Sequence, residues 1–131
     1  MINWWAIIVA GVVMFAIGAV WYTVLFGKQW RALHGIPEGT QPQGLVQAMV
    51  VGFIANLVVA YVLGLFILYY GPPTTWLSGA ETGAWAWLGF VATIMIPSIF
   101  YERRPPKLIA ISGGYQLVGL VVMGAIIGFW R

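Results

Sequence analysis

Residues 44–70 carry the sequence GLVQAMVVGFIANLVVAYVLGLFILYY, 27 residues without one charged side chain. A helix needs about 20 mostly apolar residues to cross the hydrocarbon core of a membrane. In the whole chain of 131 residues, 62% are hydrophobic and 7% are charged, whereas soluble domains have about 25% charged residues. So few charges exclude a soluble globular domain, a disordered chain and a basic nucleic-acid-binding protein. We therefore expect an integral membrane protein that contacts the lipid bilayer and no nucleic acid.

Four apolar stretches are separated by charges and helix-breaking residues. Proline lacks an amide donor and clashes inside a helix, so Pro42 and the run Gly71-Pro72-Pro73 bound the stretch quoted above. We predict an all-α fold, an integral membrane four-helix bundle in a single domain (1–131), with spans at residues 3–26, 44–70, 80–100 and 107–130. The first span has no Lys or Arg before its apolar run and ends in Trp21-Tyr22, so we expect it to be retained and not cleaved as a signal peptide.

The basic residues gather at one end of the predicted bundle. Five of the six Lys and Arg residues fall in or beside the loops at residues 27–43 and 101–106. These five are Lys28, Arg31, Arg103, Arg104 and Lys107. Because cytoplasmic loops are enriched in Lys and Arg, we expect both loops to be cytoplasmic and both termini to lie outside. Residues 28–34 are expected to form a short interfacial helix that ends at Gly35 and Pro37.

Aromatic residues lie near both ends of the predicted spans, as they do in membrane proteins with aromatic belts. The belt expected at the outer end comprises Trp4, Trp5, Tyr69, Tyr70, Trp76 and Trp130. The belt expected at the cytoplasmic end comprises Trp21, Tyr22, Trp30, Phe100 and Tyr101.

The inventory of reactive residues is small. The chain has no Cys and one His, His34, and it contains no Asp. A zinc site normally needs three or four ligands from Cys, His and carboxylate, and a Ser-His-Asp triad lacks its Asp. We therefore expect no metal site, no cofactor and no enzymatic activity.

Small residues recur every fourth position in two of the predicted spans. In the span at 44–70 they are Ala48, Gly52, Ala60 and Gly64, with Asn56 in the middle. In the span at 107–130 the same spacing holds for Ser112, Gln116, Gly124 and Gly128. Small residues let membrane helices approach closely, so these stripes predict helix contacts, either within one bundle or between chains.

Four polar residues lie within the predicted spans: Asn56, Thr93, Tyr115 and Gln116. Polar groups at this depth are costly to expose to lipid, so they are expected to face the bundle interior or another subunit. One interpretation is a small polar substrate site or pathway; the other is structural hydrogen bonding between helices. Proton relays normally use Asp, Glu or His, and the absence of these residues at depth favours the structural interpretation.

Glu81 is the one acidic residue at the outer end. It is a candidate for a cation-attracting mouth or a proton-binding carboxylate. The alternative is a first-turn Glu that complements the helix dipole, with Ser78 nearby as the cap.

Arg103, Arg104 and Lys107 are candidates for binding anionic lipid headgroups. The simpler interpretation is that they determine topology, with a local ion pair to Glu102.

Residues 21–30, WYTVLFGKQW, resemble the signature of a bacterial membrane family catalogued as domain of unknown function 1761. Further matches are AYVL at 60–63, LGFVAT at 88–93, FYERRP at 100–105, GYQL at 114–117 and MGAI at 123–126. The resemblance implies four spans in a bacterial inner membrane, and it implies no established activity and no assigned site residues. It also implies His where this chain has Gln116, and this departure puts a protonation role at that position in doubt.

Two functions remain open from the sequence. The first is a homo-oligomeric channel or transporter for a small solute or ion, because four short spans leave little room for a path inside one bundle. The alternative is a non-transporting module that binds or stabilises another membrane protein or lipid, which the lack of deep charges favours. An intramembrane enzyme ranks third because acid, base and nucleophile candidates are too few.

Overall fold

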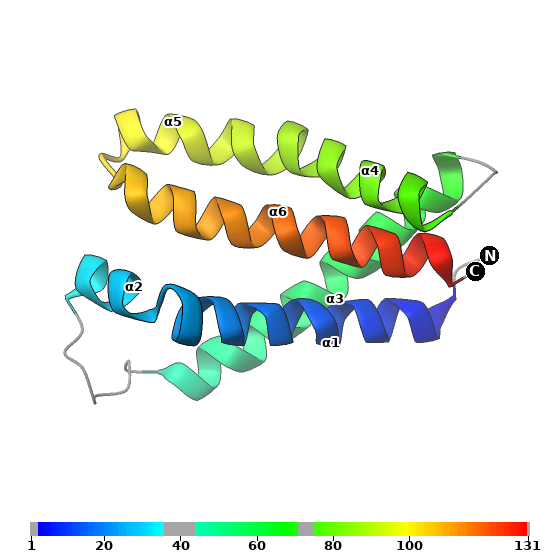
Figure 1. Ribbon diagram of the computed structural model, residues 1–131, viewed down its shortest axis with the longest axis horizontal. Helices are drawn as coiled ribbons and strands as arrows, with labels where there is room; N and C mark the ends of the chain where they lie inside the picture. The colour runs from blue at the N-terminus through cyan, green and yellow to red at the C-terminus, as the bar shows by residue number, and fades with distance from the viewer. Residues whose placement is uncertain (1–2, 36–43, 71–74, 131) are drawn as a thin grey trace.

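The computed structural model describes residues 3–35, 44–70 and 75–130, and this part of the chain is all-α (Figure 1). α1 (Trp4–Val20) continues into a π-helical segment, η1 (Trp21–Leu25), and is followed by the short α2 (Gly27–His34). α3 spans Leu45–Tyr70. α4 (Trp76–Trp87), a second π-helical segment η2 (Leu88–Ala92) and α5 (Thr93–Tyr101) form one continuous helix. α6 spans Pro106–Phe129.

Four helices are long and apolar enough to cross a membrane: Trp4–Leu25, Leu45–Tyr69, Trp76–Tyr101 and Pro106–Phe129. The shortest has 22 residues, which at about 1.5 Å per residue is about 33 Å, enough for a hydrocarbon core of about 30 Å. The four predicted spans are therefore confirmed, and the chain is a multi-span membrane protein.

The third span begins earlier than predicted, at Trp76 and not at Ala80. Thr75 and Ser78 form a capping box: Ser78 N donates to Thr75 Oγ1 at 3.2 Å, and Thr75 N donates to Ser78 Oγ at 2.9 Å. These bonds satisfy backbone donors at the helix start. Ser78 therefore belongs to the capping box at Thr75. Glu81 is the sixth residue of α4 and lies in its second turn. Because the dipole effect falls off within the first turn, the interpretation of Glu81 as a first-turn residue was wrong.

The short helix predicted at 28–34 is confirmed as α2, Gly27–His34. Gly35 ends it with φ of +67°, a left-handed conformation that glycine adopts without a steric penalty. Pro37, also predicted to end this helix, lies outside the described residues.

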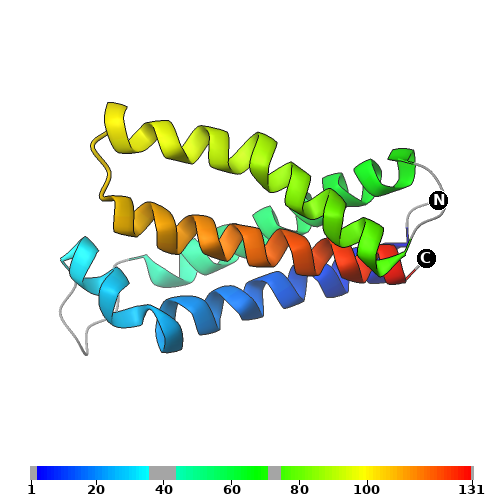
Figure 2. The same cartoon turned by 45° about the horizontal axis from the view of Figure 1, so that its top comes forward.

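α6 is the central helix of the bundle. In Figures 1 and 2, α1 and the α4–α5 helix flank α6, and α3 crosses behind them at an oblique angle. In an apolar stretch of 18 residues from each span, 44% of the residues are buried in α6, against 11–22% in the other three spans. Both ends of the chain lie at the same end of the bundle, which we call the terminal end. α2 and the α5–α6 connection lie at the opposite end, which we call the basic end.

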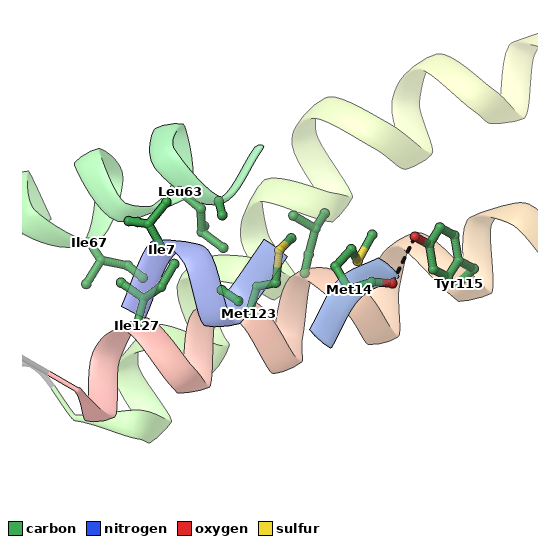
Figure 3. Close-up of a cluster of buried hydrophobic side chains, with 10 residues drawn as sticks. Ile7, Met14, Leu63, Ile67, Tyr115, Met123 and Ile127 are labelled. Atoms are coloured by element: carbon green, nitrogen blue, oxygen red, sulfur yellow. Dashed lines mark hydrogen bonds between the residues drawn. The ribbon is translucent and has the colours of Figure 1, made fainter. Parts of the chain in front are cut away.

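The core lies between α1, α3 and α6 (Figure 3). Its most buried large side chains are Met14 and Met123, which are 1% and 0% exposed. Ile7 of α1, Leu63 of α3 and Ile127 of α6 pack around them toward the terminal end. Among the described residues, no polar or charged residue other than tyrosine belongs to the buried set.

α4 and α6 meet through glycine, and their backbones touch near the terminal end. A Cβ on Gly79 would overlap the carbonyl oxygen of Gly124, and a Cβ on Gly83 would overlap that of Leu120. Gly128 lies against the same face of α4. The Gly124 and Gly128 half of the predicted α6 stripe therefore does make a helix contact, with α4. The partner pair Gly79 and Gly83 was missed, although its four-residue spacing is the signal that small-residue contacts leave in a sequence.

Only half of the small-residue stripe of α3 contacts another helix of the chain. Ala60 is fully buried, and a Cβ on Gly64 would lie 2.8 Å from Ile7 Cδ1 of α1. A Cβ on Gly52, by contrast, would meet no other atom within 4 Å, and Ala48 is exposed. The half of α3 nearer the basic end is thus open in the single chain.

Asn3 ties the two ends of the chain together. Its side-chain oxygen accepts from Trp5 N at 3.1 Å and Ala6 N at 3.3 Å, which caps α1. Its amide nitrogen donates to Trp130 O at 3.1 Å. One side chain therefore fixes the start of α1 against the end of α6.

Candidate functional site

A set of hydrogen bonds between different helices lies in the basic half of the bundle, around the first half of α6. Two indoles donate to carbonyl oxygens of this helix: Trp21 Nε1 to Ile111 O at 2.8 Å, and Trp87 Nε1 to Gly113 O at 2.9 Å. Trp21 comes from η1, and Trp87 is the last residue of α4 before η2. The missing side chain at Gly114 leaves room for one indole, since a Cβ there would lie 3.1 Å from Trp21.

Each indole belongs to a residue at the start of a π-helical segment: Trp21 is the first residue of η1, and Trp87 directly precedes η2. In η1 the turn is widened, so that Phe26 N bonds to Trp21 O at 2.9 Å, five residues back. The extra residue in a π turn changes the direction of the side chains that follow, and such bulges are frequent at functional sites. η1 and η2 coincide with the WYTVL and LGFVA sequences that carried the family resemblance.

Two tyrosines complete the cluster. Tyr115 donates its hydroxyl to Met14 O at 3.2 Å (Figure 3), and Tyr22 donates to Ser112 Oγ at 3.2 Å. Their rings meet edge to face with centroids 5.4 Å apart. We call Trp21, Tyr22, Trp87, Ser112 and Tyr115 the aromatic cluster.

Trp21 and Tyr22, expected in the belt at the cytoplasmic end, are half-buried and bond to α6. Phe100 and Tyr101 are exposed, as expected of belt residues, and so are Trp4, Trp5, Tyr69, Trp76 and Trp130 at the terminal end. The side chain of Tyr70 lies outside the described part of the chain.

The structure brings two of the four polar candidates together. The side-chain amide of Asn56, on α3, approaches the hydroxyl of Tyr115. Gln116 is half-buried on α6, and no hydrogen bond joins its side chain to the described residues. Thr93 is exposed on α5, where its hydroxyl donates to Gly89 O of its own helix at 2.6 Å.

Glu81 lies outside this cluster, on the same helix as Trp87 but nearer the terminal end. Its side chain is exposed and lines a groove of about 310 Å³ beside α3. At the basic end, Arg103, Arg104 and Lys107 are exposed. Arg104 Nε lies 3.3 Å from Glu102 Oε2, a solvated pair of a kind that contributes at most about 1 kcal/mol.

The part of the chain that the structure describes contains no group of three or more His, Cys, Asp or Glu residues placed to hold a metal ion. The aromatic cluster can donate and accept hydrogen bonds, and it carries no ionised side chain. Its contacts hold α1, α4 and α6 together in the basic half of the bundle.

A family model described as a protein of unknown function (DUF1761) matches residues 5–128. The chain belongs to this family. The match covers all four membrane spans and both π-helical segments, so the resemblance seen in the sequence is confirmed. No curated protein and no solved structure matches the chain. Membership in the DUF1761 family therefore brings no activity to the aromatic cluster.

Proposed function

We propose that the protein is a non-transporting membrane module that binds another membrane protein through the open half of α3. The observation that carries this proposal is the filled centre of the bundle. Met14 and Met123 are 1% and 0% exposed, and Tyr115 bonds across to α1. In the described chain, no buried side-chain nitrogen or oxygen lacks a hydrogen-bond partner. These features favour a packed bundle over a path for solutes.

The open half of α3 offers a surface for a second helix. Val46, Val50, Val51 and Ile54 are each more than half exposed. Ala48 and Gly52, on another face of the same half of α3, are small and lie one turn apart, which permits close approach of a transmembrane helix. A groove of about 350 Å³ between α1 and α3 adjoins the surface and is lined by Phe15 and Phe53 among others. A lipid that fills this groove is the other occupant consistent with this function.

The test is co-purification after crosslinking in native membranes. We expect the wild-type chain to retain a defined membrane-protein partner, and Gly52→Leu to lose it because the new side chain fills the approach. Ala110→Leu, at an exposed site on α6, is the matched control and keeps the partner. A monodisperse homo-oligomer that co-purifies with nothing would contradict the proposal.

The second candidate is a homo-oligomeric channel or transporter for a small solute or ion. It is favoured by Gln116, a half-buried amide without a hydrogen bond to the described residues. In an oligomer, Gln116 and Asn56 would line a path between copies. Native mass spectrometry gives the subunit count, and flux into liposomes tests transport. Flux that Gln116→Leu abolishes and Thr93→Val reduces would establish this function in place of the first.

We propose that the protein resides in the bacterial inner membrane with its basic end in the cytoplasm and its termini outside. The five basic residues at one end support this orientation. The chain has no Cys, so single-cysteine variants report sidedness directly. We expect a membrane-impermeant maleimide to label Trp130→Cys in intact inner-membrane spheroplasts and Arg103→Cys only after lysis; the reverse pattern would overturn the orientation.

A further inference from the structure

The groove at Glu81 combines a carboxylate with aromatic walls. It opens between α3 and α4 and has a volume of about 310 Å³, at the lower limit of the range of about 300–1,000 Å³ found for ligand sites. Phe66 forms its α3 side. Ser78, Glu81, Thr82 and Trp85 of α4 line the other side, and Phe90 of η2 closes the end nearer the bundle middle.

The carboxylate of Glu81 has no partner among the described residues. The ion pair in the described chain joins Arg104 and Glu102, at the opposite end, and no described residue makes a hydrogen bond or ion pair to the Glu81 side chain. The described Lys and Arg residues belong to α2, the α5–α6 connection and the start of α6. The groove therefore presents a negative charge that the described chain does not neutralise.

The hydroxyl groups beside Glu81 reinforce this polarity. Thr82 donates its proton to Ser78 O at 2.9 Å, and Ser78 donates its proton to Thr75 O at 3.1 Å. Because both protons are used, neither hydroxyl donates to a ligand; Ser78 Oγ already accepts from Thr75 N, and the Thr82 hydroxyl oxygen is left as an acceptor. Apart from the indole N–H of Trp85, the polar side-chain atoms of the groove therefore favour a positive ligand over an anion.

The aromatic residues supply the rest of the site. Trp85 follows Glu81 by four residues, so both side chains lie on one face of α4, and the indole is 71% exposed. Tryptophan is the best of the aromatic side chains at attracting a cation to its face. Farther along, the rings of Phe66 and Phe90 have centroids 6.2 Å apart and form an apolar wall.

We infer that this groove binds a soluble amphipathic organic cation, with its charged centre between Glu81 and Trp85 and its apolar body against Phe66 and Phe90. A zwitterionic phospholipid fits less well, since the described residues at this end provide a carboxylate for its ammonium and no basic side chain for its phosphate. The site does not depend on the proposed lateral contact of α3, because that contact uses the other half of the helix.

The test is equilibrium dialysis of the full chain in micelles of an uncharged maltoside, with empty micelles as reference. The probes are tetraphenylphosphonium and tetraphenylborate, which share size and shape and differ in the sign of charge. We expect saturable binding of one phosphonium per chain and at least about tenfold weaker binding of the borate, equivalent to about 1.4 kcal/mol. Equal binding of both ions would overturn the inference.

Variants locate the binding. We expect Glu81→Gln to weaken phosphonium binding about tenfold and Trp85→Leu to weaken it about threefold. Glu102→Gln makes the same change in net charge at the opposite end and is expected to leave binding unchanged. Size-exclusion chromatography and circular dichroism verify that each variant is folded. Equal weakening by Glu81→Gln and Glu102→Gln would show non-specific attraction, and competition by short-chain phosphatidylethanolamine would overturn the choice of a soluble cation.

Discussion

α6 is held by two different kinds of contact along its length. Near the terminal end its backbone touches α4 through Gly79 and Gly124. In the basic half, the indoles of Trp21 and Trp87 donate hydrogen bonds to its carbonyl oxygens. Because lipid is as apolar as leucine, membrane helices associate through van der Waals packing and hydrogen bonds. The comparison shows one helix using packing at one end and hydrogen bonds at the other.

The glycine contact is expected to be the more sensitive of the two. Gly79→Leu places a side chain where the backbone of α6 lies, and we expect the free energy of unfolding to fall by about 3 kcal/mol. Unfolding in mixed micelles of maltoside and dodecyl sulfate, followed by circular dichroism, measures it. Gly52→Leu is the control: its site has no neighbour within 4 Å, so the stability of the single chain should change little. Equal losses in both variants would indicate a general cost of leucine in these helices and not a backbone contact.

The indole bonds are expected to contribute less. Trp21→Phe and Trp87→Phe each keep an aromatic ring and remove the N–H donor. We expect each to lower the free energy of unfolding by about 1 kcal/mol. Trp85→Phe, at an exposed indole on the same helix as Trp87, serves as the reference and should cost less. If the free energy of unfolding of Trp21→Phe equals that of the wild type, the packing of the ring, and not the hydrogen bond, holds α1 to α6.

The Tyr115 contacts are the next smaller effect. Tyr115→Phe removes the donor to Met14 O and the group that Asn56 approaches. A double-mutant cycle with Asn56→Leu measures the Asn56–Tyr115 coupling in the same unfolding assay. We expect a coupling free energy of about 0.6 kcal/mol, the average for hydrogen bonds between membrane helices. A coupling of zero would show that the approach of Asn56 to Tyr115 contributes nothing to stability.

The surface ion pair should matter least. Glu102→Gln breaks the contact to Arg104, and both side chains are more than half exposed. We expect the free energy of unfolding to change by less than about 0.5 kcal/mol. A larger loss would show that the α5–α6 connection takes part in holding the basic half together.

The sequence predicted the elements better than the contacts. Span positions followed from apolar length, and α2 followed from the break at Gly35. The third span was predicted to start too late because the weakly polar run Thr75-Trp76-Leu77-Ser78 was assigned to a loop, whereas a capping box starts the helix there. Of the polar candidates, Asn56 and Tyr115 were brought together, while Thr93 and Glu81 lie elsewhere in the structure.

The amino-acid sequence by itself determined that this chain forms four membrane-spanning helices of known position. Each helix satisfies its own backbone hydrogen bonds, so an apolar stretch of sufficient length is enough to define a span. Only the tertiary structure decided which face of each helix meets which neighbour. Apolar residues lie all round α1, α3 and α6, and lipid and bundle interior are equally apolar, so no periodicity separates their buried face from their lipid face. The pairing of Gly79 with Gly124, and the inward turn of Trp21 at η1, follow from how the helices fit together.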